Sequence, residues 1–135
     1  MTGSHEYASV RYLVDDVGAA ADFYTTHLGF QLGADAAPAF AEVFRGPLRL
    51  LLSGPASSGA RATPEEAAAP GRNRIHLTVD DLAAEIERHR AAGLPFRSEV
   101  VAGPGGQQIL LADPAGNLIE LFQPAGQAPT ATAVP

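Results

Sequence analysis

Two stretches of the chain are rich in β-branched and other apolar residues and then change to a helical spacing just after an aspartate. They are residues 10–17 and residues 75–82, and they align at an offset of 75 − 10 = 65 residues. The β-branched and other apolar residues in each stretch predict a strand. Asp16 and Asp81 are then the expected helix N-caps, because a carboxylate there can accept orphan backbone N–H groups.

A helix and three strands are predicted after each of these aspartates. Gly29 ends the first helix and Gly93 the second, as C′ glycines commonly do. The helical spacing is carried by Ala20, Phe23, Tyr24, His27 and Leu28 in the first copy, and by Leu82, Ile86 and His89 or Arg90 in the second. The strands are expected at residues 30–33, 39–44 and 48–52, and again at 96–101, 108–111 and 118–122. Each half therefore reads as strand, helix and three strands.

Turn-forming residues separate and end these halves. Residues 54–73 are rich in Pro, Gly, Ala, Ser and Arg and predict a linker, with a short helical turn that has Thr63 as N-cap, Pro64 in first position and acids at Glu65 and Glu66. Residues 103–106 and 113–117 are expected turns. We predict a single domain over residues 1–124, with module one at about 7–53, the linker at 54–73 and module two at about 74–124. Residues 125–135 are expected to be a flexible tail.

Composition and charge exclude several classes of function. The 135 residues include no cysteine, which excludes thiol catalysis, disulfides and cysteine-ligated metal centres. Nine basic residues, all arginine, against fifteen acidic ones give a net charge of −6, which argues against nucleic acid as a partner. No apolar stretch reaches the roughly 18–20 residues that span a bilayer, so no membrane partner is expected. No targeting segment is recognised, and we expect a cytoplasmic protein.

The aligned motifs resemble those of the vicinal oxygen chelate superfamily, which includes glyoxalase I, bleomycin-resistance proteins, fosfomycin-resistance enzymes and extradiol dioxygenases. The residues that carry the likeness are Val14-x-Asp16, Phe23-Tyr24, Leu28-Gly29-Phe30, Val79-Asp80-Asp81 and the closing run at residues 113–122. The likeness covers roughly residues 8–124. It implies an α+β fold in which two βαβββ modules form a curved mixed sheet around a cleft, and it also implies a homodimer.

The resemblance further implies places for a divalent metal, on the first and last strands of each module. The first-strand position, seven residues before the capping aspartate, is Ser9 or Arg74, and the last-strand positions match Leu50 and Glu120. Only Glu120 is of a ligand type, and one carboxylate does not hold a catalytic metal alone. We therefore expect no metal cofactor; if a divalent ion is bound, His76 and Glu120 are the expected ligands.

Strand alternation predicts which side chains line the cleft. Those expected to point inward are Ser9, Arg11, Leu13, Leu48, Leu50 and Leu52 from the first half, and Arg74, His76, Thr78, Leu118, Glu120 and Phe122 from the second. Among them we assign ligand binding to Arg11, Leu50, Leu52, Arg74, His76, Glu120 and Phe122. Apolar walls with a few convergent polar groups are typical of small-molecule sites. The alternative is that Arg11, Arg74 and Glu120 only satisfy one another.

Two functions remain open at this point. One is a protein that binds a small organic ligand without metal, as the likeness to bleomycin-resistance proteins implies. The other is an enzyme of the same superfamily, either a metal-dependent lyase, isomerase or dioxygenase, or a metal-free form with His76 or Glu120 as base. No catalytic residue is assigned. His5, His27 and His89 are expected to be surface histidines.

Overall fold

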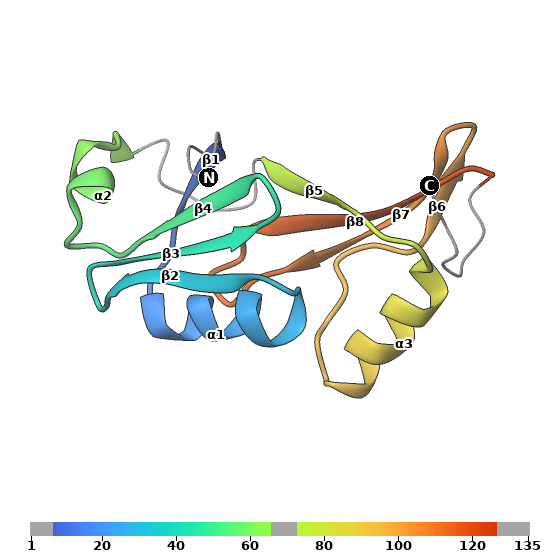
Figure 1. Ribbon diagram of the computed structural model, residues 1–135, viewed down its shortest axis with the longest axis horizontal. Coiled ribbons are helices and arrows are strands. Elements are labelled where there is room, and N and C mark those ends of the chain that lie inside the picture. Colours follow the sequence, from blue (N-terminus) through green and yellow to red (C-terminus); the bar gives the residue numbers. More distant parts are fainter. Residues whose placement is uncertain (1–6, 66–72, 127–135) are drawn as a thin grey trace, which may run out of the picture. The chain divides into compact units, whose positions relative to one another are not determined.

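The structure, a computed structural model, describes residues 7–65 and 73–126. The chain divides into two compact units (Figure 1). The first unit holds the chain up to Arg72 together with Asp113–Asn117, and the second holds Asn73–Ala112 together with the chain from Leu118. Each unit is built on a mixed four-stranded sheet and one longer helix, so the predicted α+β fold of two βαβββ modules is confirmed.

The first unit contains one mixed sheet that is covered on one face by a helix. Its elements are β1 (Ala8–Leu13), α1 (Val17–His27), β2 (Gln31–Ala36), β3 (Phe40–Arg45), β4 (Leu48–Ser53) and the short helix α2 (Ser58–Ala62). The strand order is β1-β4-β3-β2, with β1 parallel to β4 and the other pairs antiparallel. Tyr24 of α1 is fully buried, as are Val43, Leu50 and Leu52 of the sheet. These residues form the core of the unit.

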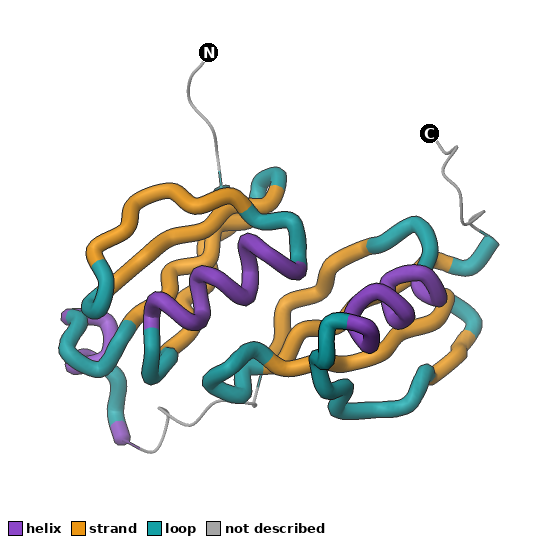
Figure 2. Tube along the Cα trace, turned by 90° about the horizontal axis from the view of Figure 1, so that it is seen from below, coloured by secondary structure: helices purple, strands orange, loops and turns teal. Residues whose placement is uncertain are grey.

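The second unit repeats this arrangement. Its elements are β5 (Arg74–Thr78), α3 (Leu82–Ala91), β6 (Val101–Gly103), β7 (Gly106–Ala112) and β8 (Leu118–Pro124), in the order β5-β8-β7-β6. Again the first and last strands of the repeat are parallel neighbours. The tube view shows α1 and α3 each lying along its own sheet (Figure 2). None of the helices in the described ranges is long and apolar enough to cross a membrane.

The ends of the two main helices follow the repeat in the sequence. The Asp16 carboxylate accepts a hydrogen bond from the backbone N–H of Ala19 at 3.0 Å, and Asp81 accepts one from Ala84 at 3.0 Å. Gly29 and Gly93 have φ angles of 75° and 81°, a left-handed conformation that favours glycine. The predicted helix starts and stops are therefore confirmed.

Two predicted elements differ from the structure. The strand expected at residues 96–101 is reduced to β6, because Phe96 makes only an isolated bridge to Leu111 and the chain then leaves the sheet until Val101. In the linker, Ser57 caps α2 and Thr63 ends it, so Thr63 is not the N-cap of that helix. The helical turn predicted after Thr63 runs into residues 66–72, which lie outside the described residues, as do residues 1–6 and most of the expected tail, 127–135.

The turn between β7 and β8 belongs to the first unit. Asp113 is buried and accepts hydrogen bonds from the Tyr24 hydroxyl at 3.0 Å and from the backbone N–H groups of Ala115 and Asn117. The Asn117 amide donates to the Leu13 carbonyl at 3.1 Å. The second half of the sequence thus supplies a loop that completes the core of the first unit.

Candidate functional site

Six side chains share the face of the second sheet that lies opposite its buried side. Residues in register on adjacent strands lie on the same face, and β5 pairs with β8 as Arg74–Leu118, His76–Glu120 and Thr78–Phe122. The other parity, Ile75, Leu77, Ile119 and Leu121, is buried. We call Arg74, His76, Thr78, Leu118, Glu120 and Phe122 the second open face. The predicted grouping of Arg74, His76, Glu120 and Phe122 on one face is confirmed.

A charged cluster occupies the middle of the second open face. The Arg74 Nε donates a hydrogen bond to Glu120 Oε1 at 3.0 Å, and His76 Nε2 lies 3.7 Å from Glu120 Oε2. Glu120 is nearly buried, with 10% of its side chain exposed, whereas Arg74 and His76 are 41% and 50% exposed. The nearly buried carboxylate therefore orients the Arg74 guanidinium, and His76 lies close to it; both side chains remain accessible to solvent. The predicted alternative of internal pairing is realised for Arg74 and Glu120.

An aromatic pair lies beside this cluster. The rings of His76 and Phe122 are 4.9 Å apart between centroids and inclined at 40°. Both residues are at least partly exposed. From β7, Gln108 and Leu110 are in register with Phe122 and Glu120 and extend the same face. The second open face thus combines an aromatic surface, an aliphatic side chain and an arginine held in place by a carboxylate.

The first sheet differs from the prediction in its last strand. Val10 is in register with Leu50, and Tyr12 with Leu52. Leu50 and Leu52 are therefore on the buried face, and both are completely inaccessible to solvent. Their predicted position on the same face as Arg11 is wrong. The register instead places Arg49, Leu51 and Ser53 with Ser9, Arg11 and Leu13, and we call these six residues the first open face.

Arg11 is held at the end of the first open face. Its Nη1 donates a hydrogen bond to the buried Ser53 hydroxyl at 2.8 Å. The helix α2 packs over the same guanidinium, and a Cβ at Gly59 would lie only 2.4 Å from Arg11 Nη1. Glycine at position 59 therefore allows the arginine to pass beneath α2. Arg49 on the same face is bonded to Ser9 at 3.0 Å and lies 3.6 Å from Glu42.

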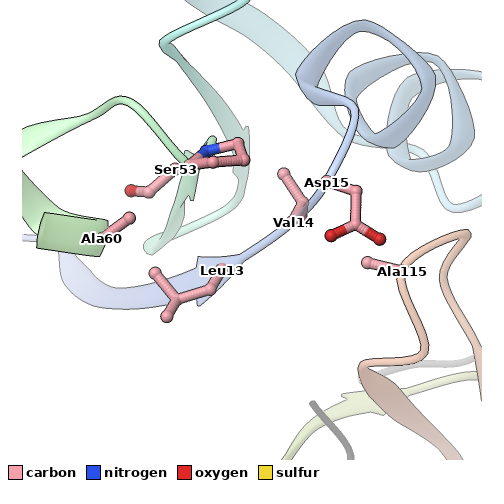
Figure 3. A pocket seen from close by; sticks show the side chains of 7 residues that line it. Leu13, Val14, Asp15, Ser53, Ala60 and Ala115 are labelled. Carbon is pink, nitrogen blue, oxygen red and sulfur yellow. The ribbon is translucent and has the colours of Figure 1, made fainter. Parts of the chain in front are cut away.

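A small pocket opens beside Ser53, at the carboxyl ends of the parallel strands β1 and β4. Its volume is about 210 Å³, and its walls come from Leu13, Val14, Asp15, Ser53, Pro55, Ala60 and Ala115. The close-up shows Leu13 and Ala60 on one side and the Asp15 carboxylate beside Ala115 on the other (Figure 3). The pocket is too small for a drug-sized molecule and suits one substituent of a larger ligand.

The residues at the metal positions implied by the resemblance do not fit a divalent ion. On the second open face the ligand types are His76 and Glu120, and Glu120 already accepts from the Arg74 guanidinium. On the first open face the residue in register with Arg11 is Leu51, which has no donor atom. Within residues 7–65 and 73–126, no group of three His, Asp or Glu side chains is placed to hold a metal.

The remaining histidines are only partly as expected. His89 is fully buried, so its predicted surface position is wrong, and its Nε2 lies 3.3 Å from Glu85 Oε1. His27 is half-buried, with its ring 5.8 Å from that of Phe23. His5 lies outside the described residues. Neither His27 nor His89 is on an open face.

The parallel register of the two sheets shows what the alternation pattern missed on β4. Arg11 and His76 are 76 − 11 = 65 residues apart and occupy the same place in their sheets. Since His76 is in register with Glu120 and Arg11 with Leu51, the counterpart of Glu120 is Leu51 and not Leu50. The sequence run from Leu48 to Leu52 has leucine at both parities, which leaves alternation uninformative there.

A comparison with protein families agrees with this architecture. The family model of the Glyoxalase/Bleomycin resistance protein/Dioxygenase superfamily matches residues 7–121 of the chain. This range includes every residue of both open faces except Phe122. A comparison with curated proteins finds no match.

Solved structures of the same fold include proteins of different function. The chain is 28% identical to TnmS3, an antibiotic-binding protein from Streptomyces sp. CB03234, with a TM-score of 0.70 over 93% of this chain and 99% of that chain. It is 26% identical to UcmS2, with a TM-score of 0.67 over 89% of this chain and 98% of that chain. Lactoylglutathione lyase from Agrobacterium tumefaciens shares the fold at 23% identity, with a TM-score of 0.71 over 90% and 96% of the two chains.

Proposed function

Because the chain belongs to the glyoxalase/bleomycin resistance protein/dioxygenase superfamily, we propose that it binds a small organic ligand on the second open face, without a catalytic metal. The observation that carries this proposal is the cluster of Arg74, His76, Glu120 and Phe122, in which a nearly buried carboxylate orients an exposed arginine next to an aromatic pair. Sites for small molecules combine such apolar surface with a few fixed polar groups.

The chemistry of the cluster defines the ligand class. The Nε of Arg74 is used by Glu120, and its terminal nitrogens remain to bind a carboxylate or another strong acceptor. The tilted rings of His76 and Phe122 offer a surface on which a planar ring can stack. We therefore expect a partly apolar molecule with an aromatic ring and an anionic or strongly hydrogen-bonding substituent. The similarity to an antibiotic-binding protein supports an organic ligand of this kind.

The two leucines of the earlier assignment are excluded from this site. Leu50 and Leu52 are inaccessible core residues of the first unit. Apolar contact is assigned instead to Phe122 and Leu110 of the second open face. Arg11 is on the first open face, where its bond to Ser53 beside the small pocket makes it a candidate for a separate polar contact.

Binding is favoured over metal-dependent lyase, isomerase or dioxygenase activity by one specific interaction. A metal ion on Glu120 would have to displace or share the carboxylate that Arg74 holds at 3.0 Å, and it would lie close to that guanidinium charge. No reaction step is therefore assigned to His76 or Glu120.

The proposal is tested by calorimetry on the full chain with a panel of aromatic carboxylic acids and aromatic antibiotics. For a compound that binds, Arg74→Ala should weaken the affinity about tenfold to a hundredfold, because a charge-assisted hydrogen bond is lost. Phe122→Ala should weaken it as well, through loss of the stacking surface.

Arg88→Ala is the matched control, because Arg88 is an exposed arginine of the same unit that is on α3 and not on the second open face. It should leave the affinity unchanged. Circular dichroism and thermal unfolding of each variant show whether the unit is still folded. A compound that binds folded Arg74→Ala and Phe122→Ala as tightly as the parent protein would contradict the assignment.

A further inference from the structure

The second unit has a groove on its helix side, between α3 and the segment that leads into β6. The groove has a volume of about 460 Å³. Ile86 and Arg90 of α3 form one wall, Phe96 and Val100 form the other, and Ile109 of β7 lies at the floor. Ile109 belongs to the buried face of the sheet, so the groove is on the opposite side from the second open face.

The groove exists because the chain leaves the sheet before β6. Phe96 bridges to Leu111, and the Arg97 N–H donates to the Leu110 carbonyl at 2.7 Å. At the next residue a side chain takes the place of a backbone acceptor: the Leu110 N–H donates its hydrogen bond to the Ser98 hydroxyl at 3.0 Å. Residues 98–100 are thereby released from strand pairing. The ribbon shows this segment running back beside α3 before it joins β6 (Figure 1).

The first unit has no comparable departure from its sheet in the described residues. There β2 is a strand of six residues that pairs with β3 from Gln31 to Ala36, with one irregularity. The helix α1 buries Val17, Ala20, Ala21, Phe23 and Tyr24, whereas α3 buries only Leu82 and His89. The looser packing of α3 is what leaves apolar surface accessible between the helix and the segment before β6.

The lining of the groove is mixed: Ile86, Phe96, Val100 and Ile109 are apolar, whereas Arg90, Ser98 and Glu99 are polar or charged. Val100 is 45% exposed, and Val101, which follows it, is 53% exposed. The Arg90 guanidinium lies 5.6 Å from the centre of the Phe96 ring. Among the residues that the structure describes, none places a carboxylate within 4.0 Å of Arg90. Its terminal nitrogens are therefore available to an anion at the rim.

We propose that this groove binds a small aliphatic monocarboxylate, with its chain against Ile86, Phe96 and Val100 and its carboxylate paired with Arg90. The volume is in the range of small-molecule sites. Arg90 can pair with one anionic group of the ligand. Glu99, which also lines the groove, would repel a second one, so a single negative charge is expected. An arginine stacked on an aromatic ring keeps its hydrogen-bonding edge free for a two-point contact with a carboxylate.

The test uses octanoate, with octanamide as its neutral counterpart, in titrations of the isotope-labelled full chain followed by the amide NMR signals. Octanoate should shift the signals of α3, of residues 96–100 and of Ile109, and octanamide should bind more weakly. Arg90→Ala should weaken octanoate binding about tenfold, as expected for loss of one charge-assisted hydrogen bond. Glu99→Gln should strengthen it, because a repelling charge is removed.

Arg97→Ala is the matched control here, because Arg97 is opposite Leu110 and does not line the groove, and it should leave the octanoate affinity unchanged. Val100→Asp places a charge on an exposed wall residue, so it should abolish binding without disturbing the buried core. The proposal is overturned if octanoate at millimolar concentration shifts none of these signals, if it shifts only those of the second open face, or if Arg90→Ala binds it as well as Arg97→Ala. Because the groove and the second open face are on opposite sides of one sheet, failure at one does not imply failure at the other.

Discussion

At the scale of single residues, Tyr24 connects the core of the first unit to the turn that follows β7. Its hydroxyl donates to Asp113, which also accepts from the backbone of Ala115 and Asn117. Tyr24 has no exposed surface, so this hydrogen bond is made to a charged group away from water. Hydrogen bonds to charged groups are among the stronger ones in proteins.

We therefore expect Tyr24→Phe to lower the free energy of unfolding by about 1.5–3 kcal/mol, measured by urea denaturation. Thr26→Val removes a hydroxyl from an exposed residue of the same helix, and it should cost less than about 0.5 kcal/mol. An equal loss of unfolding free energy in the two variants would mean that the buried hydrogen bond from Tyr24 to Asp113 does not stabilise the fold.

Tyr24 should also make the stability of the fold depend on pH. Burial, together with the charge of the neighbouring Asp113, raises the pKa of Tyr24 well above its ordinary value. Above about pH 10 an unfolded tyrosine loses its proton while folded Tyr24 keeps it. The contribution of protonated Tyr24 to the free energy of unfolding is thus fully present below about pH 10 and is lost as the pH rises. Stability should fall more gently between about pH 9.5 and 11 in Tyr24→Phe than in the parent protein, and parallel slopes would argue against this assignment.

At the scale of elements, each main helix begins at an aspartate of the repeated motif. Asp81→Ala should lower the free energy of unfolding by about 1 kcal/mol, because it leaves the Ala84 N–H without its acceptor. The neighbouring Asp80 is exposed and does not cap the helix, so Asp80→Ala should cost under about 0.5 kcal/mol. Thermal unfolding of the two variants measures the difference, and the prediction is wrong if Asp80→Ala is the more damaging change.

How well sequence predicted structure also differs from element to element. On β5, polar residues occupy one parity and apolar residues the other, and on β8 the apolar Ile119 and Leu121 flank Glu120, so alternation predicts both faces of the second sheet correctly. On β4, leucine occurs at both parities, and only the parallel register with β1 determines that Leu50 and Leu52 are buried. Pairing register depends on tertiary structure, which explains why the prediction for Leu50 and Leu52 is wrong while that for Ser9, Arg11 and Leu13 on β1 places them on one face.

His89 shows a signal that was present in the sequence but not used. It is 89 − 24 = 65 residues after Tyr24, which is the offset of the repeat, and both residues are fully buried on their helices. A polar residue at a core position of a helix is hard to predict from its own chemistry. Its repeat partner identifies the position directly.

At the scale of the whole molecule, both sheets end in strands with unpaired edges in the described residues. The edge strands are β1 and β2 in the first sheet and β5 and β6 in the second. Leu32 of β2 and Val101 of β6 are about half exposed. Exposed apolar edge strands favour pairing with another chain.

A homodimer is therefore expected, as the family resemblance also implies. Sedimentation velocity of the full chain at micromolar concentration should show a species of twice the mass of 14.0 kDa. A single species of monomer mass over the whole micromolar range would refute the dimer. Leu32→Lys would test whether the β2 edge takes part, since a charge on an edge strand opposes association.

The central claim is that a small organic ligand binds without a metal ion, and calorimetry before and after metal removal tests it most directly. A compound that binds the purified chain should be titrated again after dialysis against a chelator, with the metal content of both samples measured by elemental analysis. The account predicts less than about 0.1 equivalent of divalent metal and the same dissociation constant in both titrations, since the proposed contacts come from Arg74, His76 and Phe122. Binding that disappears with the chelator and returns when one equivalent of zinc, nickel, manganese or iron is added would contradict it.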